Sequence, residues 1–202
     1  MVLACLGVRG AVPQLAHHSL FFTQDWNRNF GDIFGAEPRI PEPASSYVSR
    51  PSATDPTVAP TGCESLFVLV PVPADVTLGG GGADGNGDPA IEKVADAAID
   101  QIASWASLPD LRSRIVVRRT FGPADFAADF NAWSGAALGP AHTLRQSAVF
   151  RTGNVSRKVS GLYYAGASTL PGIGLPMCLI SAELVVKHLR GDRSSKPLEV
   201  TG

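Results

Sequence analysis

The segment from Leu162 to Leu189 holds the residue types and spacing that best suit ligand chemistry. An apolar run, Gly161 to Gly166, leads into a turn of small residues and prolines that ends at Pro176. Small residues allow a backbone to approach a flat ligand closely. Proline suits the first turn of a helix, whose free N–H groups near Pro176 and Met177 would face an electron-rich ligand. The pattern predicts a buried strand, a ligand-contacting turn and a helix.

The end of this helix is also marked in the sequence. Glu183 and Lys187 are spaced as an i,i+4 ion pair. Lys187, His188 and Arg190 occupy a last turn before Gly191, where cations and a following glycine are favoured. Because a strand, a glycine turn and a helix occur in most α/β proteins, the spacing by itself also fits a purely structural role.

Several further elements must position this unit. Residues 65–72 are apolar almost throughout, which predicts a core strand covered on both faces. Residues 89–105 carry apolar side chains at three- and four-residue steps behind Asp88 and Pro89, which predicts an amphipathic helix. The other expected elements are strands within 15–23, 46–50 and 114–121, a helix from 123 to 133, an extended segment at 144–151 and a polar turn at 153–158.

Residues 78–88 form the glycine-rich run LGGGGADGNGD. Glycines cannot fill a core, and their flexibility predicts an exposed, flexible loop. The run lacks the GK[ST] ending of a phosphate-binding loop, so nucleotide binding of that kind is not expected.

Composition excludes several classes of protein. The formal net charge of −1 over 202 residues gives no global field for attracting nucleic acid. Cys5, Cys63 and Cys178 are far apart and odd in number, which argues against a disulfide framework or zinc site and favours a reducing, intracellular compartment. No positive region precedes the apolar start, so a signal peptide is not expected. Prolines and glycines interrupt 162–182, so it should not span a bilayer as a helix.

Other polar residues give no catalytic group. His17 and His18 are adjacent and would face opposite sides of a strand. Asp125 and Asp129 are expected on a solvated helix face rather than at a metal. Arg145 and Arg151 flank an apolar segment, where surface anchoring is favoured over lining a cleft. The triplet at Asn154 matches a glycosylation pattern that often arises by chance, and it is discounted.

The sequence GLYYAGASTLPGIGLPMCLISAE resembles the C-terminal flavin motif of the bacterial-type phytoene desaturases. Leu170 stands where that family usually has His or another polar residue, and Ile173 replaces a smaller one. The resemblance extends upstream and covers nearly the whole chain. Its other parts are His17-His18-Ser19, Asp55-Pro56, Ala59-Pro60, Gly62, Leu66 to Pro73, and Gln146-Ser147-Ala148 with Phe150-Arg151.

This resemblance implies a mixed α/β (α+β) fold, the C-terminal part of a two-domain Rossmann-like flavoprotein. Residues 1–150 would form most of the sheet of a substrate-binding domain. Residues 151–191 would be the C-terminal segment of the FAD-binding domain, and 192–202 a tail. The family begins with a strand–GxGxxG–helix unit that takes the FAD pyrophosphate on a helix N-terminus. That unit is not expected in this chain, whose one match to the GxGxxG pattern, 80–85, lies within the glycine-rich run, so a missing N-terminal half is an implied partner.

The implied activity is FAD-dependent dehydrogenation of C–C single bonds in a C40 polyene such as phytoene, in carotenoid biosynthesis. Gly166 and Ala167 would approach the phosphate–ribityl part of FAD. Gly174, Leu175, Pro176 and Met177 would meet the isoalloxazine. The family also implies a cytoplasmic protein attached peripherally to a membrane, while the isolated chain is expected to be inactive. Two alternatives stay open: a flavin oxidoreductase acting on another apolar substrate, and a non-catalytic truncated product or partner subunit.

Overall fold

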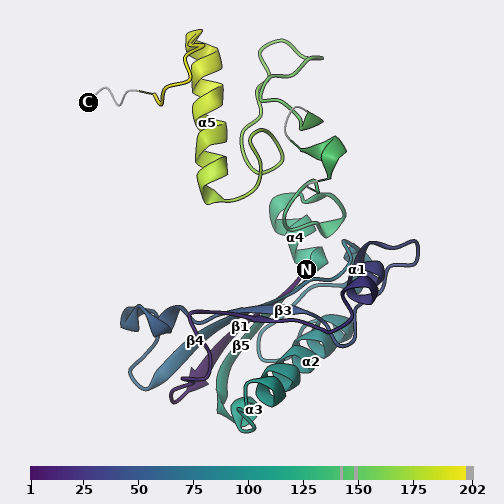
Figure 1. The fold of residues 1–202 in the computed structure, drawn as a ribbon, viewed down its shortest axis with the longest axis vertical. Helices are drawn as coiled ribbons and strands as arrows, with labels where there is room; N and C mark the ends of the chain where they lie inside the picture. The colour runs from purple at the N-terminus through teal and green to yellow at the C-terminus, as the bar shows by residue number, and fades with distance from the viewer. Residues whose placement is uncertain (142, 148–149, 199–202) are drawn as a thin grey trace. The chain divides into compact units, whose positions relative to one another are not determined.

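The computed structural model describes residues 1–141, 143–147 and 150–198 (Figure 1). The chain divides into two compact units, Met1–Ala137 and Leu138–Gly202. The sequence predicts the domain boundary after residue 150 instead. The substrate-binding role of the first part and the FAD-binding role of the second stay predictions. Each unit is described by itself below.

The first unit is built on a five-stranded antiparallel sheet in the order β2-β3-β4-β1-β5. The expected mixed α/β class is therefore confirmed at this level. The strands are β1 (Val2–Arg9), β2 (His18–Phe21), β3 (Ser46–Ser49), β4 (Cys63–Val70) and β5 (Ile115–Phe121). Strands were expected close to β2, β3, β4 and β5.

The strand β1 was not expected, although it lies between β4 and β5. Its residues alternate between buried and half-buried, with Val2, Ala4, Leu6 and Val8 directed into the core. Such period-two alternation is the signal of a strand with one covered face. Residues 2–8 are apolar or glycine throughout, so the sequence itself shows no such alternation, and the strand is defined by its pairing with β4 and β5.

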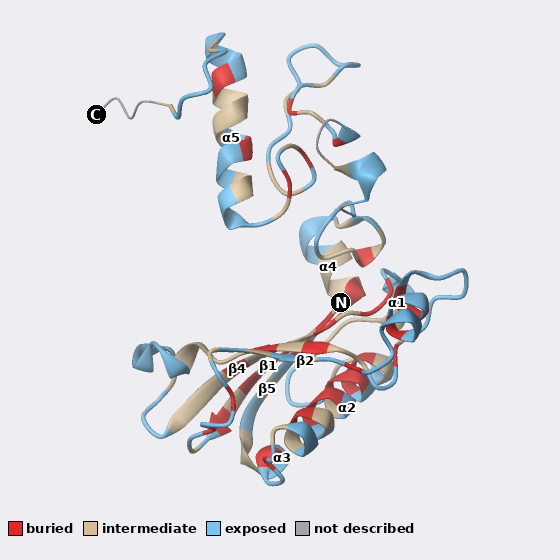
Figure 2. Ribbon diagram, in the orientation of Figure 1, coloured by how far each residue is buried: buried red, intermediate tan, exposed pale blue. Residues whose placement is uncertain are grey.

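Helix α2 (Pro89–Trp105) packs on one face of the sheet and agrees with its predicted bounds. Figure 2 shows the buried residues gathered between α2 and the strands. In β4, only Leu66, Val68 and Val70 are buried, while Phe67 and Leu69 on the other face are half-exposed. The expectation that this strand is covered on both faces is therefore wrong for the described structure, because α2 covers one face only.

The glycine-rich run 78–88 is exposed as expected at 83–86 and 88, but hydrogen bonds hold it against β5, so the expectation of a flexible loop is corrected. The N–H of Gly81 donates to Asp125 Oδ2 at 2.6 Å, and that of Gly82 donates to Thr120 Oγ1 at 2.9 Å. Ala83 forms a β-bridge with Arg119, so the run covers the outer edge of β5. The half-buried Asp125 thus accepts a hydrogen bond from the glycine-rich run and does not belong to a solvated face, contrary to expectation. Asp129 is exposed as expected.

The remaining helices of the first unit are shorter. They are α1 (Trp26–Phe34), α3 (Leu111–Arg114) and α4 (Pro123–Phe130), with single 3-10 turns at Pro51–Ala53, Pro56–Val58, Val76–Leu78 and Trp133–Gly135. Helix α4 ends before the predicted residue 133 because Asn131 adopts the left-handed conformation that terminates a helix. Helix α1 was not expected.

The second unit contains α5 (Leu175–Arg190), which begins after Gly174 and ends at a left-handed Gly191, as expected. The predicted strand 161–166 is not formed, since a single bridge between Val155 and Tyr163 is its only strand-like pairing in the described chain. A strand needs a continuous ladder of hydrogen bonds. Here the pairing with 154–156 consists of two bonds, from the N–H of Ser156 to the carbonyl of Leu162 at 2.9 Å and from the N–H of Tyr164 to the carbonyl of Asn154 at 2.8 Å. Leu144–Gln146 forms a 3-10 turn rather than an extended segment, and residues 148–149 of that prediction lie outside the described residues.

Replacing Gly81 with alanine tests the close packing of the glycine-rich run. The added Cβ would collide with the backbone of Thr120 and Phe121, so we expect Gly81→Ala to lower the free energy of unfolding by about 1–3 kcal/mol. Urea denaturation measures the change. The control is Gly31→Ala in α1, where a Cβ meets nothing within 4 Å and a small gain is expected. Equal stability of Gly81→Ala and the wild type would contradict the packing.

Candidate functional site

The turn between Gly166 and Gly174 has a backbone that requires glycine at both ends. Gly166 has φ +117° and Gly174 has φ +113°, conformations that residues with a Cβ rarely adopt. No described atom lies within 4 Å of a Cβ built at Gly166. The turn therefore combines a fixed backbone shape with open space next to Gly166.

Ser181 of α5 holds this turn against the helix. Its side chain is fully buried, and its Oγ accepts a hydrogen bond of 3.0 Å from the N–H of Gly166. The same oxygen lies 2.9 Å from Thr169 Oγ1. Ser181 thus links the start and the middle of the turn to the body of α5.

Asn154 closes the same network from the other side. Its side-chain nitrogen lies 3.0 Å from Ser181 Oγ, 3.0 Å from the carbonyl of Tyr164 and 3.2 Å from that of Leu170. An amide group has two hydrogens, so these acceptors share them. Because the side chain is buried and bonded, it is not accessible to a glycan in this structure, in line with discounting that triplet.

Arg151 is buried beneath the turn, with 6% of its surface exposed. Its Nε donates to the carbonyl of Thr169 at 2.9 Å, and its two terminal nitrogens donate to the carbonyls of Gln146 and Ala167. The expectation of a surface anchor is therefore wrong for Arg151, while Arg145 is exposed. Sequence reasoning missed Arg151 and Asn154 as parts of the site, although Arg151 ends one of the segments that carry the family resemblance.

The N-terminus of α5 is left without a side-chain cap. The first helical N–H to find an acceptor is that of Cys178, which donates to the carbonyl of Gly174 at 2.9 Å. Pro176 has no N–H, and those of Leu175 and Met177 donate to no described residue. The six predicted cofactor residues thus lie on one turn and its helix, with Gly166 and Ala167 at one end and 174–177 at the other. Their ligand role stays a prediction.

The first unit contains a second candidate surface, the face of the sheet opposite α2. Because directly paired residues of antiparallel strands share a face, the register defines an apolar row across all five strands. The row consists of Leu20, Tyr47, Leu69, Leu3 and Phe121. We call it the apolar row.

A neighbouring row on the same face contains Cys5, which is paired with Phe67 and Arg119. Burial raises the pKa of the Cys5 thiol above its ordinary value, so the thiol is neutral at pH 7. This part of the face is therefore uncharged up to Arg119 on the edge strand. All three cysteines are free thiols.

The expectation that the side chains of His17 and His18 face opposite sides of a strand is wrong. Their ring centroids are 4.3 Å apart because β2 begins only at His18, so His17 does not follow the strand alternation. His17 Nδ1 lies 2.8 Å from Thr54 Oγ1, and His18 Nδ1 lies 2.7 Å from the Tyr47 hydroxyl. Both imidazoles thus have hydroxyl partners.

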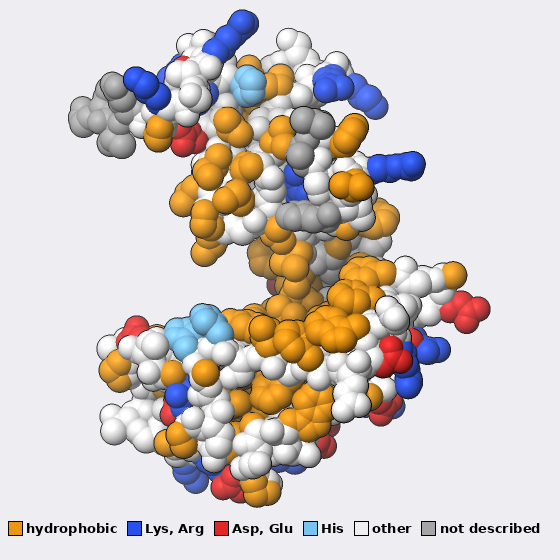
Figure 3. Space-filling view, in the orientation of Figure 1, with side chains coloured by type: hydrophobic (Ala, Val, Ile, Leu, Met, Phe, Trp, Pro, Cys, Tyr) orange, Lys and Arg blue, Asp and Glu red, His pale blue; other side chains and the backbone are white. Residues whose placement is uncertain are grey.

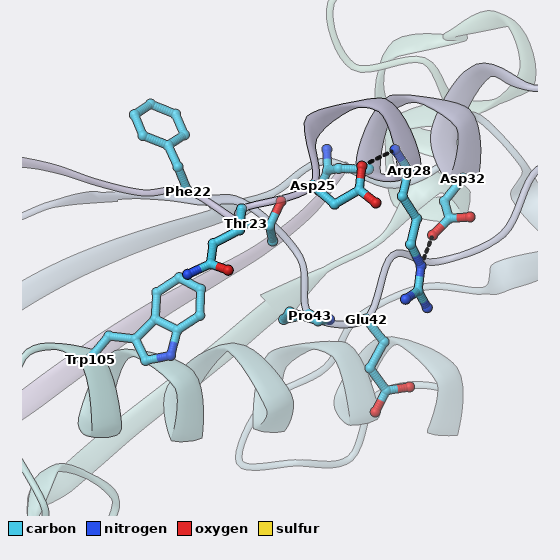
Figure 4. Close-up of a pocket in the computed structure, with 10 residues that line it drawn as sticks. Phe22, Thr23, Asp25, Arg28, Asp32, Glu42, Pro43 and Trp105 are labelled. Atoms are coloured by element: carbon cyan, nitrogen blue, oxygen red, sulfur yellow. Dashed lines mark hydrogen bonds and ion pairs between the residues drawn. The ribbon is translucent and has the colours of Figure 1, made fainter.

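A pocket of about 520 Å³ lies beside α1, between Phe22 and Trp105 (Figure 4). Three of its four charged side chains, those of Asp25, Arg28 and Asp32, have partners, and the fourth is that of Glu42. Asp25 caps α1 by accepting from the N–H of Arg28, and Asp32 contacts Arg28 at 3.8 Å and Arg39 at 2.6 Å. This pairing favours a structural role for the charged groups over catalysis.

The polarity of α1 is reversed relative to an ordinary surface helix. Asn29 and Asp32 are buried, while Trp26, Phe30 and Phe34 are exposed. With Phe22, these rings form a series in which successive centroids are 4.8, 5.8 and 6.3 Å apart. We call Phe22, Trp26, Phe30 and Phe34 the aromatic ladder. Figure 3 shows extensive hydrophobic surface on the first unit.

Two features are absent from the described residues. No group of three or more His, Cys, Asp or Glu residues there is arranged to hold a metal ion. No helix within the described part of the chain has the length and apolar character needed to cross a membrane.

Comparison with known proteins gives extensive similarity over nearly the whole chain. The carotenoid 3,4-desaturase of Haloarcula japonica is 43% identical over 190 residues, which is 94% of this chain and 36% of the relative. The zeta-carotene-forming phytoene desaturase of Myxococcus xanthus is 39% identical over 185 residues, or 91% and 34%. The 4,4'-diapophytoene desaturase (4,4'-diaponeurosporene-forming) of Staphylococcus haemolyticus is 37% identical over 175 residues, or 87% and 34%.

The chain spans about a third of the length of the curated relatives that it matches. No protein-family model matches it.

Substituting Asn154 with alanine tests the network beneath the turn. The change removes the amide donor from buried oxygens, which costs about 1–3 kcal/mol per unsatisfied group. The N–H groups of Tyr164 and Leu170 donate to the carbonyls of Asn154 and Thr152, and we expect both amides to exchange with solvent about tenfold faster or more. Hydrogen exchange followed by NMR measures this. Asn27→Ala, at an exposed position of α1, is the control, and unchanged exchange in Asn154→Ala would refute the network.

Proposed function

The chain is homologous to a part of the carotenoid and phytoene desaturases, and from this premise we propose that it is the C-terminal part of an FAD-dependent desaturase. Its substrate would be a long apolar polyene such as phytoene, in which C–C single bonds become double bonds. The observation that carries the proposal is the glycine turn, which Ser181 fixes against the body of α5 and which leads into the uncapped N-terminus of that helix.

The turn fits one side of a flavin. Open space next to Gly166 leaves room for a ligand at that backbone, and the unpaired N–H groups of Leu175 and Met177 are hydrogen-bond donors at the positive end of α5. Gly166 and Ala167 would bind the phosphate–ribityl part, and 174–177 would contact the isoalloxazine. When bound, FAD accepts the hydride that the substrate loses.

The protein's own contribution to the chemistry is then orientation and exclusion of water. The apolar row offers a substrate surface without a charged side chain, which suits a hydrocarbon that cannot form hydrogen bonds. None of the neighbouring histidines is needed for such a surface. The departures at Leu170 and Ile173 from the family pattern keep a different apolar substrate as the second candidate.

A chimera tests this function. Residues 1–198 of this chain would replace the matching third of the Myxococcus xanthus enzyme, to which it is 39% identical. We expect the chimera to retain bound flavin and to convert phytoene into a coloured product, measured by absorbance of the purified protein and by pigment extraction from cells. A folded chimera without flavin would contradict the proposal.

The matched control for the chimera is substitution at Gly166 or Gly174 by valine. Both positions need a positive φ, so a β-branched residue should distort the turn, and we expect bound flavin to fall to less than about a tenth. Gly153→Val, at another glycine with open space, should retain flavin.

A chimera with flavin but no action on phytoene would support the alternative apolar substrate.

We further propose that the aromatic ladder attaches the protein peripherally to a membrane. The polar side chains of α1 are fixed inward by the hydrogen bond of Asn29 Oδ1 with the N–H of Ser45 and by the ion pair of Asp32 with Arg39. The helix therefore cannot rotate its rings into the protein without breaking these contacts. Trp and Phe side chains are well suited to the boundary between headgroups and acyl chains.

Replacing Phe34 with serine tests this attachment. Burial of one such side chain contributes about 1.5–3 kcal/mol, so we expect Phe34→Ser to weaken binding to phosphatidylcholine vesicles about tenfold or more in a sedimentation assay. The control is Phe130→Ser in α4, since Phe34 and Phe130 are both 74% exposed. Equal loss in the two variants would point to general hydrophobicity rather than the ladder.

A further inference from the structure

Arg151 carries a positive charge that the described chain does not neutralise. It is 6% exposed, and its hydrogen bonds go to the neutral carbonyls of Gln146, Ala167 and Thr169. No ion pair of the described residues includes it. Buried charges are normally paired, because removing a charge from water is costly without a counter-charge.

None of the described residues of the second unit supplies that counter-charge. Between residues 138 and 198 the only carboxylate side chains are Glu183 and Asp192, and both lie next to Lys187. The same range contains eight basic side chains, Arg145, Arg151, Arg157, Lys158, Lys187, Arg190, Arg193 and Lys196. The net charge of the whole chain is close to zero, but residues 138–198 of the second unit are strongly basic.

Arg151 also fixes the direction of a peptide group in the turn. The carbonyl of Ala167 accepts from the guanidinium, so it is directed inward. In a planar trans peptide the next N–H points the opposite way, which directs the N–H of Ser168 away from Arg151. Neither this N–H nor that of Ala167 donates to any described residue.

We propose that Arg151 is a positioning residue for a phosphate group of the bound cofactor. It presents the Ala167–Ser168 peptide with its N–H outward, and its charge attracts the phosphate from behind the turn through a medium of low dielectric. A phosphate is the anionic part of FAD, so this inference rests on the proposed function. The guanidinium acts through the carbonyls and does not itself touch the ligand.

The test compares Arg151→Lys, which keeps the charge, with Arg151→Gln, which keeps a donor but removes the charge. The isotope-labelled 202-residue chain is titrated at low salt with inorganic pyrophosphate and, separately, with riboflavin, which has no phosphate. We expect pyrophosphate to shift the amide resonances of Ala167 and Ser168. Its affinity should fall about tenfold in Arg151→Gln and stay within about threefold in Arg151→Lys, because the first variant removes the buried charge that attracts the phosphate and the second keeps it.

Riboflavin separates this role from a structural one. Its affinity should change less than about twofold in either variant, whereas a general distortion of the turn would weaken both ligands alike. Arg145→Gln, an exposed arginine six residues earlier, is the matched control and should bind like the wild type.

Three results would overturn the role of Arg151. These are pyrophosphate shifts confined to other basic residues, equal affinities in Arg151→Gln and the wild type, or a second unit that unfolds in both Arg151 variants. If riboflavin shifts residues 174–177 while pyrophosphate leaves Ala167 and Ser168 unchanged, the flavin function stands and this inference fails. If pyrophosphate binds there but riboflavin does not bind at 174–177, the proposed flavin site fails instead.

Discussion

Buried hydrogen bonds around Ser181, rather than an apolar core, hold the second unit together. Every side chain of the hydrophobic core cluster belongs to residues 2–111, within the first unit. In the second unit the buried side chains are polar, namely Arg151, Asn154, Thr169, Ser181 and Lys187. Each must keep its partners, because an unsatisfied polar group in a buried site is costly. The shape of the glycine turn therefore depends on this network.

The apolar residues of α5 are distributed accordingly. Leu175 is 85% exposed and Leu179 is 74% exposed, while Ser181 and Lys187 are buried. An exposed apolar helix face of this kind is typical of a surface that another component covers. It is consistent with the proposed flavin contact at α5, in a chain that spans about a third of the length of its relatives.

The first unit is stabilised differently, by an ordinary apolar core between α2 and the sheet. The register of β1 directs Val2, Ala4, Leu6 and Val8 toward that core and leaves Leu3 and Cys5 on the other face. A one-residue shift would exchange the two sets, so the same pairing that stabilises the core also creates the apolar row. The proposed substrate surface thus follows from the strand alternation.

The parts of the fold that the sequence predicted are those with local signals. Helices α2 and α5 have helical periodicity and recognisable ends at Pro89, Pro176 and Gly191, and both were confirmed. The packed glycine run was mispredicted because its hydrogen bonds reach distant residues such as Thr120 and Asp125. A local sequence pattern cannot indicate contacts with residues so far away in the chain.

In the candidate site, too, the features with local sequence signals were predicted and those that depend on distant contacts were not. The glycines of the turn were recognisable from their spacing, and the family resemblance agrees with the homologous relatives. The positions of Arg151 and Asn154 beneath the turn were not recognised, because their partners Thr169 and Ser181 lie 15 to 27 residues away, a range within which no periodicity operates. The strand at 161–166 failed for another reason, since a strand exists only where a neighbour pairs with it.

The most direct measurement of the central claim is photolabelling of the chain with 8-azido-FAD, followed by peptide mapping, since a covalent label records even weak binding. The account places the label on peptides covering residues 161–180, with labelling suppressed by an excess of unmodified FAD. Label on the glycine-rich run 78–88 or on the pocket beside α1, or labelling that excess FAD does not suppress, would contradict a flavin site at this turn.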